Sequence, residues 1–170
     1  MWRAVRRLGG GLLAAVAAIG IVFVVGMRTK SPLVLNAVRR TGRATKRFVL
    51  PSAGTPGGIA SVIRHDGRVS GRPYETPVNA VPTDEGFVIA LPYGRNTDWL
   101  KNVLAKGSAT IVHEGATHRL DRPEIVGTPV VAALFPSKDQ QMHRRFRVDE
   151  CLLLRRVDVG DAADRIADPT

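Results

Sequence analysis

The chain has almost no cysteine: Cys151 is the only one in 170 residues. A single thiol cannot form an intramolecular disulfide or a cysteine-rich metal site, and this scarcity fits a reducing compartment. Cys151 stands in an apolar run, residues 150–157, that is typical of a buried strand. We therefore interpret it as a core residue and not as a nucleophile.

Acidic residues are absent from the first 65 positions of the chain. Residues 1–65 hold eleven Lys and Arg, whereas residues 66–170 hold fourteen of these bases against all fifteen acids. The net charge of +10 therefore belongs to the N-terminal part, and the rest of the chain is close to neutral. Since a nucleic-acid-binding domain carries its positive charge on the folded body, we expect no nucleic-acid partner.

The sequence also lacks the usual constellations of catalytic side chains. It contains no G-x-S-x-G elbow, no G-x-G-x-x-G fingerprint and no P-loop. His65, Asp66 and Ser70 have the ingredients of a triad but lie within six residues on one turn. His113 and His118 have no convergent carboxylate nearby, so we predict exposed strand residues and no metal site. With no catalytic side chains in view, a cofactor that carries the chemistry is a consistent explanation.

The N-terminal part does contain a long uncharged run, residues 8–27, which is long enough to span a bilayer as a helix. The alternatives are a buried soluble helix, which would need a polar face, and a signal peptide with Arg3, Arg6 and Arg7 as its basic region. The run is not followed by a small-x-small cleavage pattern. We therefore predict a transmembrane helix within an anchor, residues 1–30, and the bases that follow it predict a membrane-anchored body facing the cytoplasm.

A juxtamembrane helix and a linker are predicted for residues 31–58. Ser31 and Pro32 are typical of a helix start, and the residues that follow combine an apolar side with many arginines. Such a helix could lie on anionic lipid or pack on the folded body, and the sequence leaves both open. Residues 51–58 have the composition of a linker.

The body, residues 59–158, has turn signals at short intervals that indicate an antiparallel meander or barrel. The predicted strands cover residues 59–64, 74–81, 87–91, 109–113, 117–120 and 150–157. A helix is predicted at 97–106 and a less regular helical region at 127–148. Residues 159–170 are polar, and we predict a flexible tail there. Together these patterns predict a mainly β fold, a small barrel with helices across its openings.

Two stretches of the body have the features of an anion site. Residues 66–77 combine glycines, a serine and flanking arginines between two strands, which suits an anionic ligand but also a solvated hairpin. In residues 91–102 a strand leads directly into a helix N-terminus, where free N–H groups can hold an anion and Tyr93 and Trp99 add flat apolar surface. Alone, that stretch could equally be a capped helix with core aromatics. Together the two stretches suit a phosphorylated aromatic cofactor.

Both stretches resemble conserved segments of the deazaflavin-dependent nitroreductase family. The motifs are G-R-x-S-G-x-P at 67–73, with Thr76-Pro77 after it, and A-L-P-Y-G-R-N-T-D-W-L-K-N-V-L-A-K-G at 90–107. The resemblance covers roughly residues 30–158. It implies an FMN-binding-type split β-barrel of six to seven antiparallel strands that holds the deazaflavin coenzyme F-420 and is often dimeric. The implied enzyme is a reductase that transfers hydride to a small, apolar acceptor such as a quinone, a nitroaromatic compound or an enone.

The resemblance also implies which residues touch the cofactor. The loop would bind its phosphate and acidic tail, the next strand would line it, and the second motif would border the ring and complete the pocket. The implied cofactor-binding residues are Arg68, Ser70, Gly71, Tyr74, Thr76, Pro77, Val78, Ala90, Leu91, Pro92, Tyr93, Asp98, Trp99 and Asn102. Val69 departs from the family pattern, because the better-known members have Lys there, and Arg64 or Arg72 could compensate.

The acceptor side departs further from the family. Where nitroreductase members have a Y-P-S-Y-x-x-Y pattern, this chain reads F-P-S-K-D-Q-Q at 135–141. The implied substrate pocket therefore has Phe135, Lys138 and Gln141 in place of tyrosines, and nitroimidazole reduction is not expected. An anchored member could instead reduce a lipid-soluble quinone. Two rivals stay open: a split barrel that binds FMN or haem, and a non-catalytic, membrane-attached cofactor-binding module.

Overall fold

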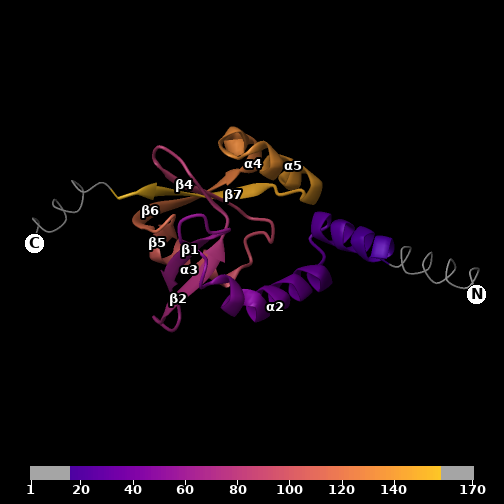
Figure 1. The fold of residues 1–170 in the computed structure, drawn as a ribbon, viewed down its shortest axis with the longest axis horizontal. Helices are drawn as coiled ribbons and strands as arrows, with labels where there is room; N and C mark the ends of the chain where they lie inside the picture. Colours follow the sequence, from indigo (N-terminus) through magenta and orange to yellow (C-terminus); the bar gives the residue numbers. More distant parts are fainter. Residues whose placement is uncertain (1–15, 158–170) are drawn as a thin grey trace, which may run out of the picture.

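The computed structural model describes residues 16–157, and these form a curled antiparallel sheet of seven strands with helices around it (Figure 1). The strand order is β2-β1-β5-β6-β7-β4-β3, and the predicted mainly β fold is confirmed. The strands are β1 Ser61–Asp66, β2 Pro73–Val78, β3 Ala80–Pro82, β4 Gly86–Ala90, β5 Ser108–His113, β6 Ala116–Gly127 and β7 Glu150–Arg156. The helices are α2 Pro32–Val49, α3 Asp98–Lys106, α4 Thr128–Val131, the 3-10 turn η1 Ala132–Leu134 and α5 Ser137–Phe146.

The sheet is curled, and its two edge strands, β2 and β3, follow one another directly in the chain. β2 and β3 lie at opposite ends of the strand order, yet only Asn79 separates Val78 from Ala80. The single strand predicted at 74–81 is therefore two strands that join different neighbours, β1 and β4. Val78 and Ala80 both enter the same core, because side chains two positions apart in an extended chain point to the same face.

The core fills the inside of the curled sheet. It is built from the inward-facing apolar residues of the strands and from two residues of α3, Leu100 and Val103. Helix α3 contacts β1 and β5, so it closes one opening of the barrel. Its end is set by Gly107, whose φ of 73° lies in the left-handed region that favours glycine. The prediction of a helix at 97–106 is confirmed to within one residue.

A second layer covers the outside of β4 and β7. Val88 and Cys151 point outward from these strands and are buried against Val131 and Phe135 of the α4–α5 segment. Strand β4 is therefore buried on both faces. Burial raises the pKa of the Cys151 thiol, as expected for a core residue. The helical region predicted at 127–148 is divided into α4, η1 and α5, and Pro136 lies between η1 and α5.

Strand β6 is longer than the sequence predicted, twelve residues in place of four. Its pairing with β7 shifts between Asp121 and Glu124, where Arg122 has a φ of 50°. A bulge of this kind lets a strand continue through proline and charged residues. Pro123 and its charged neighbours hid this continuation, because they are typical of a turn.

The two histidines predicted to be exposed are half-buried. The imidazoles of His113 and His118 both pack on the ring of Phe87, with ring centroids 5.5 and 5.1 Å away. His113 Nδ1 lies 2.8 Å from Ser61 Oγ. Within residues 16–157, no group of three or more potential ligand side chains is placed to hold a metal ion.

The N-terminal part begins, where it is described, with a helix at Val16–Arg28 that lies beside α5 (Figure 1). Phe23 meets the ring of Phe146 edge-on, and Arg28 donates a hydrogen bond to the Arg145 carbonyl. Residues 8–15 of the predicted span lie outside the described residues. Among those described, no single helix has the length and apolarity to cross a membrane; only the pair Val16–Arg28 and α2, bent by 102°, does so jointly.

Helix α2 starts where the sequence predicted, after Ser31 and with Pro32 in its first turn. It packs on the body through Leu35 and contacts β2. The residues after it, 51–58, are held against the β5–β6 turn, since Gly115 N–H donates to the Gly54 carbonyl at 2.6 Å.

Candidate functional site

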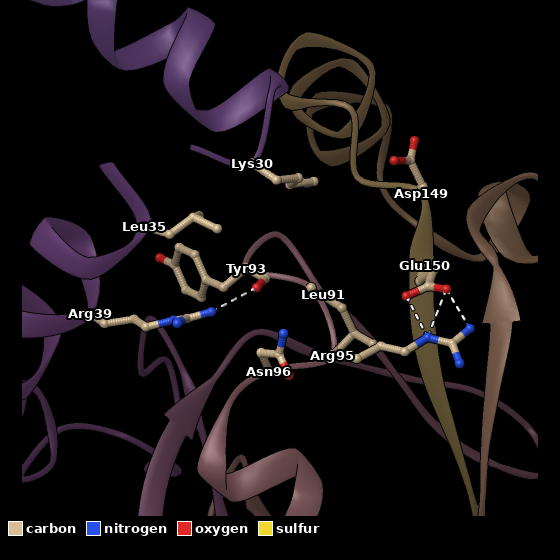
Figure 2. Close-up of a pocket in the computed structure, with 10 residues that line it drawn as sticks. Lys30, Leu35, Arg39, Leu91, Tyr93, Arg95, Asn96, Asp149 and Glu150 are labelled. Atoms are coloured by element: carbon tan, nitrogen blue, oxygen red, sulfur yellow. Dashed lines mark hydrogen bonds and ion pairs between the residues drawn. The ribbon is translucent and has the colours of Figure 1, made fainter. Parts of the chain in front are cut away.

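A cavity of about 390 Å³ lies between α2, the segment that joins β4 to α3, and the start of β7. Figure 2 shows Leu35 and Arg39 on the α2 side and Asp149 and Glu150 on the β7 side. Its size falls within the range of small-molecule sites. The cavity is therefore the first candidate for a ligand site.

The N-terminal segment is fastened to the rim of this cavity by two hydrogen bonds. Arg39 Nη2 donates to the Tyr93 carbonyl at 3.2 Å, and Lys30 Nζ donates to the Pro92 carbonyl at 3.2 Å. Burial lowers the pKa of Lys30, while the nearby charges of Asp149 and Glu150 act in the opposite direction. Burial also raises the pKa of Tyr93, so its phenol is neutral at neutral pH.

The charged groups of the cavity are not equally paired. Arg95 Nε donates to both carboxylate oxygens of Glu150, at 2.8 and 2.9 Å, and this lowers the pKa of Glu150. In contrast, no carboxylate within residues 16–157 lies in ion-pair distance of Arg39. Arg39 Nε is buried and has no hydrogen-bond partner among the described atoms.

The second feature is the loop between β1 and β2, at residues 67–72. Gly71 N–H donates to the Gly67 carbonyl at 2.7 Å, and Gly71 has a φ of 64°, which favours glycine. A side chain at Gly67 would collide with the Ser70 hydroxyl and the Tyr74 ring. Val69 stands at the tip and is 92% exposed. The loop is therefore a tight turn that presents residues 69–72 to solvent.

A chain of hydrogen bonds ties this loop to α3. Asn102 Oδ1 accepts from the backbone N–H of Arg68 at 3.2 Å and from its Nη1 at 2.9 Å. The amide nitrogen of Asn102 therefore faces His65 Nδ1, at 3.2 Å, and His65 Nε2 lies 3.3 Å from Thr76 Oγ1. An imidazole that accepts at Nδ1 and donates at Nε2 is neutral. This matches its lowered pKa, whose largest cause is burial.

The predicted loop residues lie around this chain. Ser70 Oγ is 3.3 Å from the Tyr74 hydroxyl and accepts from the Arg72 N–H at 3.3 Å. The Tyr74 ring stacks on His65 with centroids 5.8 Å apart. Asp98, in the first turn of α3, accepts from Arg68 Nη2 at 3.4 Å. The two stretches that the sequence singled out, 66–77 and 91–102, are thus in contact.

The remaining predicted cofactor residues divide between cavity and core. Leu91 and Tyr93 line the cavity, and Pro92 gives its carbonyl to Lys30. The residues that pack in or against the two core clusters are Val78, Ala90, Leu91 and Trp99. Pro77 is half-buried on β2. The Thr97 hydroxyl at the N-cap of α3 is buried without a partner among the described atoms and makes no side-chain cap bond.

The three predicted substrate residues lie on or just before α5. Phe135 is buried with its ring edge-on to His143, at a centroid distance of 4.6 Å. Lys138 and Gln141 are exposed. Of the described residues that line the 390 Å³ cavity, none belongs to 135–141.

Sequence reasoning missed the residues that the N-terminal part contributes. Lys30 falls in the predicted anchor, and Leu35 and Arg39 fall in the predicted juxtamembrane helix, for which packing on the folded body was one of two open alternatives. Arg95, Asn96, Asp149 and Glu150 also line the cavity. Arg95 and Asn96 lie inside the second motif and could have been found there, whereas no local signal marks the other residues.

Solved structures with a similar fold were found. One is described as a domain-swapped dimer; it is 12% identical with a TM-score of 0.45, over 70% of this chain and 99% of its own. An F-420-H2-dependent reductase is 12% identical with a TM-score of 0.40, over 56% of this chain and 93% of its own. An F-420 reductase is 11% identical with a TM-score of 0.41, over 64% and 92%. Each likeness concerns the fold alone. No protein-family model and no curated protein matched the chain.

Proposed function

We propose that this chain is an oxidoreductase that uses the reduced deazaflavin coenzyme F-420. The observation that carries the proposal is the contact between its two motif segments, made where Arg68 meets Asn102. The segment that leads into the same helix lines a cavity with Leu91 and Tyr93. The two segments whose motifs resemble the deazaflavin-dependent family are thus adjacent, as a shared cofactor site requires.

The loop has the groups that a phosphate or an acidic tail needs. Arg72 is exposed and makes no ion pair within residues 16–157, so its guanidinium is available. The Ser70 hydroxyl and the left-handed turn at Gly71 lie beside it. Arg68 shares its guanidinium with Asn102 and Asp98. We infer that Arg68 mainly holds the loop in place, while Arg72 meets the anion.

The cavity has the surface that a planar ring needs. Leu35, Leu91 and the Tyr93 ring form apolar wall at its edge, and Tyr93 is half-buried. When bound, the reduced deazaflavin supplies a hydride. The chain's own part is to orient the ring and exclude water, which the segment fastened by Lys30 and Arg39 would do.

The acceptor in this proposal is a small, apolar quinone, nitroaromatic compound or enone. Lys138 and Gln141 are exposed on α5 and are our candidates for contact with it. Phe135 is buried against His143, so we propose that it shapes this side of the molecule by packing.

Cofactor titration tests the proposal. The purified chain is titrated with F-420, FMN and haem while fluorescence or absorbance is followed. Replacing Arg72 by Ala should weaken F-420 binding by about 1–3 kcal/mol, the worth of a charged contact, and Ser70→Ala should weaken it less. Arg68→Ala should also weaken binding, because it removes the contacts with Asn102 and Asp98 that hold the loop. Arg144→Ala, an exposed position on α5, is the control and should bind as the unmodified chain does.

The same titration separates the rival functions. Binding of FMN or haem without F-420 would replace our cofactor assignment by that of another split barrel. Binding of F-420 without turnover of quinones, nitroaromatics or enones would identify a non-catalytic cofactor-binding module. Light scattering on the same sample measures whether the chain is the homodimer that we propose.

We also propose that the N-terminal part contacts a membrane, with the body on the cytoplasmic side. Leu33 is 82% exposed and Phe48 is 70% exposed on α2. Helical spacing places them on one side with the exposed Arg40 and Arg47, a pattern typical of a helix at an anionic lipid surface. If the chain is released from membranes by carbonate at high pH, the predicted span at residues 8–27 is wrong. Binding to anionic but not neutral vesicles would then indicate surface contact.

A further inference from the structure

The cavity between α2 and β7 is lined by three basic side chains and two acidic ones. Its lining includes Lys30, Arg39 and Arg95 against Asp149 and Glu150. Arg95 is matched by Glu150, and the charges of Asp149 and Glu150 partly oppose the burial that lowers the pKa of Lys30. Arg39 is left as the positive charge that no carboxylate of residues 16–157 compensates.

Arg39 also has hydrogen-bond donors that find no acceptor among the described residues. One nitrogen, Nη2, donates to the Tyr93 carbonyl at 3.2 Å, and Nε is buried with no partner among the described atoms. A buried donor of a charged group that finds no acceptor is costly. An arginine in this state suits an oxyanion, which can accept two parallel N–H bonds from the guanidinium.

We propose that Arg39 binds an oxyanion, a carboxylate or a phosphate, on an otherwise apolar conjugated molecule that enters the cavity. Leu35 and Leu91 provide the apolar surface beside it. The inference rests on the proposed function only in so far as it treats the cavity as a ligand site. The oxyanion belongs either to the acceptor or to the cofactor's acidic tail, and the chemistry of recognition is the same.

The first arm of the test uses a matched pair of probes, 2-naphthoate and 2-naphthamide, which share a ring system and differ in charge. Isothermal titration calorimetry of the full chain should show naphthoate binding about tenfold more tightly than naphthamide. In Arg39→Gln this preference should fall to about one. Arg39→Lys keeps a cation and should retain part of it. Equal binding of both probes to the unmodified chain would overturn the inference.

Arg40→Gln is the matched control, because Arg40 is the exposed neighbour on the same helix and does not line the cavity. It should keep the preference for naphthoate. A preference lost equally in both variants would show that general positive charge attracts the probe, and the assignment to Arg39 would fail. Thermal unfolding of each variant shows whether it is folded. If Arg39→Gln is not, the comparison of Arg39→Lys with the unmodified chain takes its place.

The second arm identifies the source of the anion. F-420 and its chromophore without the phosphate and acidic tail are titrated into the unmodified chain and Arg39→Gln. If only intact F-420 loses affinity, about tenfold, the anion is the cofactor's. If neither loses affinity while naphthoate does, the anion belongs to the acceptor. Naphthoate selectivity without any F-420 binding would leave the inference standing and defeat the proposed function.

Discussion

The β1–β2 loop and the cavity under α2 are both rich in arginine, but their arginines are in opposite states. At the loop, Arg68 is bound by Asn102, and the bonding continues to His65 and Thr76. At the cavity, Arg39 has a buried nitrogen without a partner, and no carboxylate of residues 16–157 matches its charge. An arginine whose N–H groups are bonded within the protein stabilises the fold, whereas one with unpartnered N–H groups can donate them to a ligand. The difference teaches that Arg68, the arginine of the first motif, holds the loop in place, although the sequence motif suggests a ligand contact.

The largest effect is expected where the loop's polar groups depend on one residue, Asn102, which is only 5% exposed. Asn102→Ala would leave the Arg68 N–H and His65 Nδ1 without their partner, lowering the free energy of unfolding by about 3 kcal/mol. Urea unfolding measures this. Asn96→Ala at the cavity is the control, since the Asn96 side chain makes no hydrogen bond within residues 16–157, and should cost about 0.5 kcal/mol or less. Similar losses in both variants would erase the contrast between the regions.

A smaller effect is expected from adding a charge at the loop tip. Val69→Lys places an ammonium group at a position that is 92% exposed, beside Arg72. We expect about fivefold tighter binding of F-420, the worth of a good exposed charge contact. The fluorescence titration measures it, and Thr41→Lys on exposed α2 is the charge-matched control. Equal tightening by both substitutions would mean that the loop is not the phosphate site.

A pH-dependent effect is expected from His65, because its pKa is lowered in the folded chain by burial. The unfolded chain then binds a proton below about pH 6.5 that the folded chain refuses. Stability is thus fully present above that pH and is lost as the pH falls toward the folded pKa. His65→Gln should show a shallower decline between about pH 7.5 and pH 5.5 in urea unfolding. An unchanged slope would mean that His65 is not neutral in the fold.

The smallest effect is expected from changing the charge balance of the cavity. Glu150→Gln removes the carboxylate that pairs with Arg95, so the cavity gains one positive charge. Binding of 2-naphthoate should tighten by about twofold, since the pair is partly exposed. Glu85→Gln makes the same change outside the cavity, where Glu85 pairs with Arg155. If calorimetry gave the same increase in affinity for 2-naphthoate in both variants, the effect would come from overall charge and not from the charge balance of the cavity.

Local patterns predicted most of the elements. Apolar runs bounded by turn residues located six strand regions, and Lys106-Gly107 located the end of α3. They failed where a neighbour overrides local preference. Asn79 divides one predicted strand because its two halves pair with different partners, and β6 continues past Pro123 because β7 pairs with it across a bulge.

The part of the candidate site that the two motif segments form could be predicted from the sequence, and the part that α2 contributes could not. Both motif segments were recognised as anion-binding in character, because glycines, arginines and a helix start carry that chemistry locally. The contact of Arg68 with Asn102 spans 34 positions, and that of Arg39 with Tyr93 spans 54. The first could be expected from two motifs of one site. The second could not, since nothing near Arg39 in the sequence distinguishes it from Arg40.

The sequence by itself determined the chemistry available to this chain: one thiol, a basic N-terminal part without acids, and two segments suited to an anionic aromatic ligand. Tertiary structure decided which of those groups remain free. Packing of α2 on the body buries the Nε of Arg39 and brings its guanidinium to the Tyr93 carbonyl, while docking of α3 on β1 satisfies Arg68 through Asn102. The physical reason is that a charge's availability depends on which partners and how much water surround it, and both are set by residues far away in the chain.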